Sequence, residues 1–81
     1  MENLIANLLE VIVRGLVRNP DEVKIEKIDS SNEDLTVYRI IVAEDDMGRV
    51  IGKQGRIAKS IRNIARAAAI KSGERITVEI G

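Results

Sequence analysis

Apolar residues recur with a helical period at the start of the chain. Those between Asn3 and Arg18 are spaced three or four positions apart, and Asn3 is a suitable N-terminal cap, so we predict a helix over about residues 3–18; its apolar positions are Leu4, Leu8, Leu9, Ile12, Leu16 and Val17. The segment Asn19-Pro20-Asp21 is expected to end this helix. The apolar arc also includes Ile5, Val11 and Val13. It is wider than one core contact requires, so a second contact surface is possible.

The pattern then changes to that of strands. Val23–Lys27 alternates apolar and charged residues, which predicts a strand with one solvated face. Leu35–Ala43 is almost continuously apolar, as expected of a better covered and therefore central strand. The polar segment Asp29–Asp34 is predicted to form the turn between them. Arg75–Ile80 alternates again and predicts a third strand.

Two more helices are predicted between the second and third strands. Glu44, Asp45 and Asp46 place carboxylates where the first turn of a short helix would lie, and that helix must end by Gly52. Residues 56–71 are rich in Ala, Ile, Arg and Lys and predict a long helix, which Ser72-Gly73 ends. The order is therefore helix, strand, strand, helix, helix, strand, which is an α+β fold.

The composition excludes several classes of function. The chain has 81 residues, enough for one small domain, and it contains no cysteine and no histidine. Disulfides and ordinary zinc sites are therefore excluded. Because the chain also lacks the G-x-x-x-x-G-K-[ST] spacing of a nucleotide-hydrolysing loop, we expect no enzyme, no catalytic residue and no cofactor. The sequence shows neither a signal peptide nor a membrane span, so we expect a protein of the cytoplasm that does not bind membranes.

Charge is distributed unevenly, although the formal net charge is zero. Residues 1–46 carry 5 Lys+Arg against 11 Asp+Glu, a net −6, whereas residues 47–81 carry 8 against 2, a net +6. The second half could meet a polyanion, or the two halves could neutralise each other in the fold. We interpret the acidic residues 44–46 as a capping device rather than a metal site, because nothing nearby supplies the repeated oxygen ligands of a calcium loop.

The segment between the last two helices carries the most specific pattern. Gly52-Lys53-Gln54-Gly55 is a short loop flanked by glycines, which allow a close approach of the backbone and leave amides free to face an anion. The loop also lies at the N-terminus of the long helix, where phosphate is favoured. At about 100° per residue, one face of that helix carries Arg56, Lys59, Arg62, Asn63 and Arg66, and the opposite face carries Ile57, Ile61, Ile64, Ala65 and Ala68.

These residues resemble a known family. The stretch Met47–Lys59 is similar to the I-G-x-x-G signature of KH domains, and the order of elements resembles their type II (prokaryotic) arrangement, with a three-stranded sheet and three helices packed on one face. Residues 19–23 (Asn-Pro-Asp-Glu-Val) and 76–80 (Ile-Thr-Val-Glu-Ile) are similar to the small bacterial single-KH proteins of the KhpA family. The resemblance covers the whole chain, so we expect one KH domain over residues 1–81. Glu44 departs from it, since proline is expected there.

The resemblance implies an RNA-binding protein whose loop clamps the backbone of about four nucleotides of single-stranded RNA, acting in post-transcriptional regulation. Carried onto this chain, Ile51, Ile57 and the edge of the strand around residues 40–42 would line an apolar groove for bases. The implied RNA-binding residues are Arg49, Ile51, Gly52, Lys53, Gln54, Gly55, Arg56, Ile57, Lys59 and Arg62. It also implies a homodimer and partnership with a larger KH-containing RNA-binding protein.

Two points remain open at this stage. Tyr38 is the one aromatic residue in the chain, and we expect it to pack in the core rather than stack on a base. The alternative to RNA binding is a protein-interaction or dimerisation module whose glycine loop is merely a turn, because the first helix is broadly apolar and residues 65–69 are rich in alanine. The RNA targets, any base preference and the choice between RNA and single-stranded DNA are not encoded in a readable pattern.

Overall fold

The computed structural model describes residues 3–29 and 34–80, and residues 30–33 of the predicted turn lie outside this range. The described chain contains helices α1 (Leu4–Leu16), α2 (Met47–Ile51) and α3 (Arg56–Ser72), and strands β1 (Lys24–Asp29), β2 (Leu35–Ile41) and β3 (Arg75–Ile80). Short 3₁₀ turns η1 (Pro20–Glu22), η2 (Glu44–Asp46) and η3 (Lys53–Gly55) separate some of them. The predicted order of elements is confirmed.

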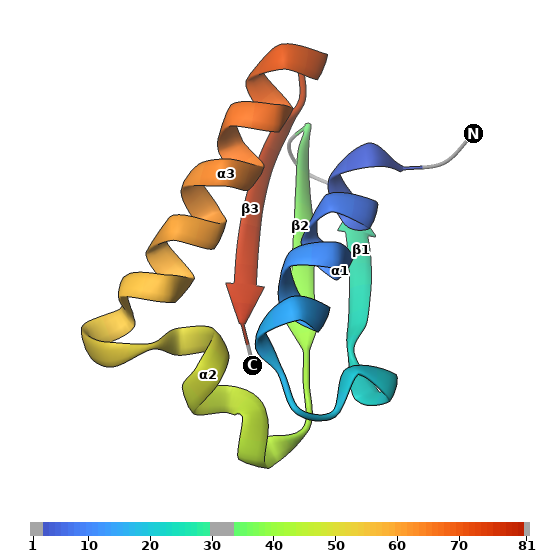
Figure 1. Cartoon of the computed structure of the whole chain (residues 1–81). Helices are drawn as coiled ribbons and strands as arrows, with labels where there is room; N and C mark the ends of the chain where they lie inside the picture. The colour runs from blue at the N-terminus through green and yellow to red at the C-terminus, as the bar shows by residue number, and fades with distance from the viewer. Residues whose placement is uncertain (1–2, 30–33, 81) are drawn as a thin grey trace.

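The three strands form one mixed sheet in the order β1-β2-β3, which confirms that β2 is central (Figure 1). β1 and β2 are antiparallel, whereas β2 and β3 are parallel. β2 ends at Ile41, two residues before the predicted end, because its partner in β1 is Lys24, the first residue of that strand. Val23 was predicted to begin β1 but precedes it, and the strand extends to Asp29 through pairing with Thr36.

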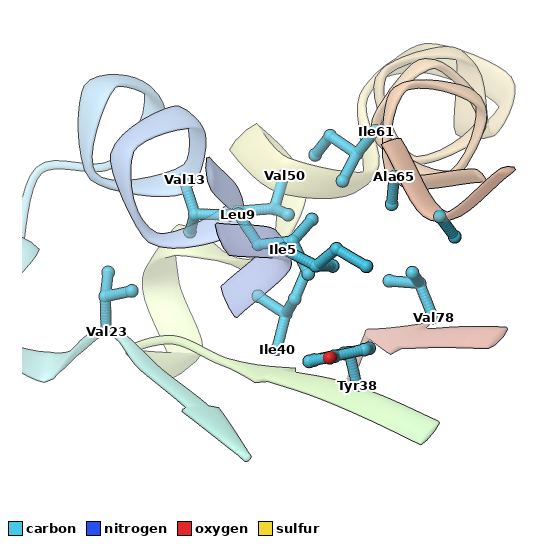
Figure 2. Packing of buried hydrophobic residues seen from close by; sticks show 11 residues of the cluster. Ile5, Leu9, Val13, Val23, Tyr38, Ile40, Val50, Ile61, Ala65 and Val78 are labelled. Atoms are coloured by element: carbon cyan, nitrogen blue, oxygen red, sulfur yellow. The ribbon is translucent and has the colours of Figure 1, made fainter. Parts of the chain in front are cut away.

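The helices lie on one face of the sheet and bury the core between the two layers (Figure 2). Tyr38 and Ile40 of β2 are fully buried there. Tyr38 is therefore a packing residue, as predicted, and its hydroxyl oxygen accepts a hydrogen bond from Asn3 Nδ2 at 2.8 Å. The other members of the buried cluster are Ile5, Leu9, Val13, Val23, Val50, Ile61, Ala65, Ala69 and Val78. None of the helices in the described segments is long and apolar enough to cross a bilayer.

The first helix confirms the predicted cap and part of the predicted apolar arc. Asn3 Oδ1 accepts a hydrogen bond from the amide of Ala6 at 3.1 Å, and the helix ends at Leu16, two residues before the predicted end. Ile5 and Val13 are buried, but Leu4 and Val11 are 80% and 72% exposed. The wide arc therefore serves the core on one side and leaves apolar side chains in solvent on the other.

The long helix α3 packs on the sheet through small residues. Its buried positions are Ala58, Ile61, Ala65 and Ala69. Ile64 was predicted on this inward face but is 45% exposed, because the buried arc is centred on Ala65 and Ile64 lies about 100° away from it. Gly73 ends the helix in the left-handed conformation (φ 76°, ψ 19°), which confirms the predicted stop.

Candidate nucleic-acid interface

The loop between α2 and α3 has an unusual backbone conformation. Gly52 has φ 75° and ψ 177°, and Gly55 has φ 72° and ψ 15°. Gln54 has φ 57° and ψ 26° and is the one non-glycine residue with positive φ among the described residues. Three of the four loop positions thus occupy a region that residues with a side chain rarely adopt. This folds the chain back tightly at the start of α3 (Figure 1).

The loop closes through a short set of backbone hydrogen bonds. The amide of Gly52 donates to the carbonyl of Gly48 at 2.9 Å, and the amide of Gly55 donates to the carbonyl of Gly52 at 3.2 Å. The amide of Arg56 donates to the carbonyl of Lys53. These bonds do not use the amides of Lys53 and Gln54 at the exposed tip of the loop. These two amides lie at the N-terminal end of α3 and can serve as donors for an anion.

Gly52 is required for a steric reason as well as a conformational one. A Cβ built on Gly52 would lie 2.6 Å from Cγ1 and 2.9 Å from Cβ and Cδ1 of Ile57. The side chain of Ile57 therefore covers the backbone of Gly52 at the start of α3. A Cβ built on Gly55 would meet nothing within 4 Å. The two glycines consequently have different roles, since Gly55 supplies conformation and Gly52 supplies both conformation and space.

Exposed positive side chains that have no acidic partner among the described residues lie in this loop and along α3, with Arg66 farther along the helix beside Glu74 and Arg75. Within residues 3–29 and 34–80, none of the following side chains forms an ion pair, and all four are exposed: Lys53, Arg56, Lys59 and Arg66. The fold therefore does not neutralise this surface with its acidic half. Of the two readings of the charge asymmetry, the structure favours a positive face that is available to a polyanion.

Two other predicted site residues are engaged within the protein. Arg62 is half-buried, and its Nε donates a hydrogen bond to the carbonyl of Val78 in β3 at 3.3 Å. It faces the edge strand of the sheet rather than the solvated side of α3. Arg49 is about half exposed, and its Nε lies 3.8 Å from Oδ1 of Asp46. Sequence periodicity placed Arg62 in the basic arc because it carries no information on the neighbouring strand.

The predicted apolar groove is only partly formed. Ile51 is 37% exposed beside the loop, and Ile57 is half-buried between Gly52 and the core. Of residues 40–42, which were predicted to line this groove, Ile40 cannot do so because it is fully buried in the core, whereas Ile41 and Val42 are half-buried at and just after the end of β2. The strand at the edge beside α3 is β3.

A pocket of about 600 Å³ lies at the end of α3 opposite the loop, where Leu4, Lys71 and Ser72 are among its lining residues. The feature that distinguishes the loop is its backbone conformation, because exposed cations without an ion pair also lie elsewhere on the described surface, among them Lys24, Lys27 and Lys71.

The role of Asp46, which links two segments that are distant in the chain, was not predicted from the sequence. The acidic segment was predicted to cap its own helix, but the Asp46 side chain makes no capping bond to α2. Its carboxylate instead accepts hydrogen bonds from the amides of Arg18 and Asn19, both at 3.0 Å, and from Asn19 Nδ2 at 2.9 Å. Among the described residues, no group of three acidic side chains is placed to hold a metal ion.

The same contacts set the protonation of this carboxyl group. The Arg18 amide, with the Asn19 side chain and amide and the Arg49 guanidinium, holds the pKa of Asp46 below its usual value of 3.8. Burial acts in the opposite direction and is outweighed. Asp46 is therefore a buried anion that is stabilised by donors from the chain after α1.

The fold and the glycine loop define a type II KH domain. The strands β2 and β3 are parallel neighbours, and the chain between them forms two helices joined by the G-x-x-G turn. The family model for the KhpA/KhpB KH domain matches residues 6–80. The chain is 49% identical over 73 residues to the RNA-binding protein KhpA of Clostridium acetobutylicum, which covers 90% of this chain and 95% of that protein. It is 45% identical over 82 residues to the RNA-binding protein KhpA of Listeria monocytogenes, which covers 99% of this chain and 97% of that one. The chain belongs to the KhpA/KhpB KH domain family.

Solved structures of a larger protein share the fold. Era from Aquifex aeolicus bound to GDP·AlF4⁻ matches 95% of this chain with a TM-score of 0.61 and 23% sequence identity. Era in complex with MgGDPNP and part of 16S ribosomal RNA matches the same share with a TM-score of 0.61 and 24% identity. The chain spans 29% of the length of either Era chain. This likeness establishes the fold, and nothing else of Era is carried over.

Proposed function

We propose that this protein is an RNA-binding protein that holds single-stranded RNA against the G-x-x-G loop and the first turns of α3. The single observation that carries the proposal is the coincidence of a tight positive-φ loop with exposed cations that have no acidic partner. The names of the relatives at 41–49% identity support the same activity. The proposed contact residues are Arg49, Ile51, Gly52, Lys53, Gln54, Gly55, Arg56, Ile57, Lys59 and Arg62.

Each part of this surface has a distinct task in the proposal. The bare backbone of the loop lets a sugar-phosphate strand approach closely, and Lys53 and Gln54 at its tip contact phosphate and sugar. Arg56 and Lys59 attract the strand along α3. Ile51 and Ile57 supply apolar contact to bases. No aromatic side chain takes part, because Tyr38 is buried in the core.

A double substitution at the loop tip tests the proposal. Lys53→Asp with Gln54→Asp should abolish measurable binding of a short single-stranded oligoribonucleotide in fluorescence anisotropy, while the thermal transition stays near that of the wild type. Aspartate tolerates positive φ better than most residues, so position 54 remains compatible with the fold. Unchanged affinity with a normal thermal transition would refute the assignment.

The matched control changes the same amount of charge elsewhere. Lys24→Asp with Arg75→Gln also removes three units of formal charge, and both residues are exposed on the sheet. They share the outward-facing register of Arg39, which pairs with Glu26 and Glu79 away from the helices. This control should bind RNA much more tightly than the loop variant. If both variants weakened binding equally, RNA would be bound by non-specific charge attraction, and the assignment of the loop as the binding site would be refuted. A DNA oligonucleotide of the same sequence tests whether the 2′-hydroxyl contributes.

The salt dependence of binding tests the role of α3. Lys59→Gln should lower the magnitude of the slope of log K against log salt by about 0.7, the value expected for one phosphate contact of a single strand. Lys71→Gln removes the same charge at the other end of the same helix and should leave the slope unchanged. A slope that responds equally to both changes would contradict the placement of the strand near the loop.

We further propose that the protein self-associates and can pair with a larger KH-containing RNA-binding protein. Leu4 and Val11 lie one above the other on the outer side of α1 and remain largely exposed, which supports an apolar contact between chains. Val11→Glu should shift the molar mass measured by light scattering towards the monomer, whereas Ile28→Glu on the sheet should not. A dimer unaffected by Val11→Glu would place the interface elsewhere. Scattering with and without RNA separates this role from RNA binding.

The remaining parts of the proposal follow from composition and family. Residues 1–81 form one KH domain that acts by binding alone, in the cytoplasm and without a cofactor, and the absence of histidine and cysteine supports this. The cellular role proposed is post-transcriptional regulation. Crosslinking in cells followed by sequencing of the bound nucleic acid tests it, because enrichment of defined transcripts is expected and their absence would contradict it.

A further inference from the structure

The contacts of Asp46 point to a role in shaping the RNA-binding surface. Asp46 is the one buried acidic or basic residue among residues 3–29 and 34–80, and its side chain is 1% exposed. A buried charge is costly unless hydrogen bonds and opposite charges compensate for it. Here both carboxylate oxygens accept hydrogen bonds from a segment that lies 27 and 28 positions earlier in the chain. The side chain therefore ties two distant segments together.

The first segment needs such a partner. The helix α1 ends at Leu16, and Val17 is already extended with φ −98° and ψ 162°. The amides of Arg18 and Asn19 follow there and precede Pro20, the first residue of η1. Both amides donate hydrogen bonds to the Asp46 carboxylate. Without it, these amides would need water as their acceptor.

The second segment is the short helix that leads into the loop. α2 has five residues, Met47–Ile51, and a helix of this length is not stable on its own. Val50 anchors α2 in the core. Asp46, the residue immediately before α2, is held in place by its hydrogen bonds to the chain after α1. Arg49 lies on the first turn after Asp46, with its Nε 3.8 Å from Oδ1. Gly52 follows α2 directly, so the position of α2 determines where the loop begins.

We propose that Asp46 is a positioning residue for RNA binding, because its carboxylate fastens the start of α2 to the end of α1 and holds the Arg49 guanidinium through an ion pair. The inference rests on the proposed function. Asp46 itself is buried and does not touch the RNA. Its effect passes through α2 to the loop and through the ion pair to Arg49.

The substitution Asp46→Asn separates positioning from simple electrostatics, because the two predict opposite signs. It keeps the size of the side chain and raises the formal net charge from 0 to +1, which alone should tighten binding of a polyanion. An amide, however, cannot accept on both sides, so an N–H group would face the donors of Arg18 or Asn19. We expect RNA binding to weaken by about fivefold or more, the lower end of typical couplings between sites.

The experiment measures the affinity of each folded variant for one oligoribonucleotide, at a temperature where circular dichroism shows the native state. Asn3→Ala serves as a control that loses stability at the far end of α1 and should bind like the wild type. Arg49→Gln completes a double-mutant cycle with Asp46→Asn, and non-additive effects are expected because the two side chains are paired. Binding that is unchanged or tighter in Asp46→Asn overturns the proposal.

A readout without RNA keeps the inference distinct from the proposed function. In the free protein, Asp46→Asn should shift the amide resonances of residues 47–55 and speed their hydrogen exchange, whereas Asn3→Ala should not. If these amides respond but neither the wild type nor any variant binds RNA, the proposed function fails and the link from Asp46 to the loop stands. If Asp46→Asn does not fold, Asn19→Ala removes one donor and keeps the backbone bonds. Amides 47–55 that stay unmoved in that variant overturn the proposal.

Discussion

Replacing Gly52 with alanine should destabilise the protein much more than the same change at Gly55. The φ of 75° and ψ of 177° at Gly52 belong to a region that is essentially restricted to glycine, at a cost of about 1–3 kcal/mol for another residue. The new Cβ would also meet Ile57 at 2.6 Å and 2.9 Å, and relieving such overpacking costs roughly 1–3 kcal/mol more. Alanine also lowers the conformational entropy of the unfolded chain, which offsets about 0.4–1 kcal/mol of this loss.

The net loss expected for Gly52→Ala is therefore about 1–5.5 kcal/mol, with a midpoint of roughly 3 kcal/mol. Gly55→Ala has the left-handed φ of 72° but open space, so the expected loss is about 1 kcal/mol. Gly48→Ala lies in α2 with nothing within 4 Å of the new Cβ and should stabilise by roughly 0.5–1 kcal/mol. In a domain of this size each kcal/mol shifts Tm by about 4–8 °C, so the three variants should be well separated.

Urea unfolding followed by circular dichroism measures the series. The steric part can be isolated in an Ile57→Ala background, which removes the atoms at 2.6 Å and at one of the two 2.9 Å contacts. Gly52→Ala should cost less in that background, by about 0.5–3 kcal/mol. The reasoning is refuted if Gly52→Ala costs no more than Gly55→Ala, or if its cost is the same in both backgrounds.

Three other predictions follow from named contacts. Because the pKa of Asp46 is lowered in the folded state, its contribution to stability is complete above the usual pKa of 3.8 and is lost as the pH falls through that value towards the lowered one. The difference in unfolding free energy between the wild type and Asp46→Asn should thus shrink in urea titrations as the pH is lowered below about 4, and a constant difference would contradict the assignment. Gln54→Gly should stabilise by roughly 0.5–1 kcal/mol, because a side chain at φ 57° is strained, and a lower midpoint in urea would argue against that strain. Asn3→Ala should cost about 1–2 kcal/mol through loss of the helix cap and of the bond to Tyr38, and a thermal shift near zero would show that neither bond contributes.

Periodicity was sufficient for the elements whose pattern is local. β3 matches its predicted bounds, and Asn3 caps α1 as predicted, because alternation and capping depend on neighbours in sequence. The loop was located for the same reason, since its glycines are adjacent to the helix that they begin. Strand ends were less accurate. β2 stops at Ile41 because β1 offers it no partner beyond Lys24, and that limit belongs to the pairing rather than to either segment.

What the sequence could not provide are contacts between distant segments. Asp46 reads as a local cap because the donors that it serves lie 27 and 28 positions away. The sequence pattern predicts that Arg62 is a solvated cation, because its hydrogen-bond acceptor, the carbonyl of Val78, lies in another element and comes close only in the folded sheet. Ile64 was predicted to lie on the buried face of α3 because isoleucine contributes more to an apolar pattern than alanine does. Alanines nevertheless form most of that buried face. No signal in one sequence distinguishes these positions from ordinary surface residues.

The parallel pairing of β2 with β3 has a consequence for the nascent chain. Arg39 and Glu79, which face each other across these strands, are 40 positions apart, and the whole segment that carries the loop lies between them. Residues 56–72 are synthesised before β3, so Ala65 and Ala69 lack the strand that covers them until the last residues of the domain have been added. The loop is therefore made before the scaffold that holds it, and its final shape must wait for the slow closure of this long connection.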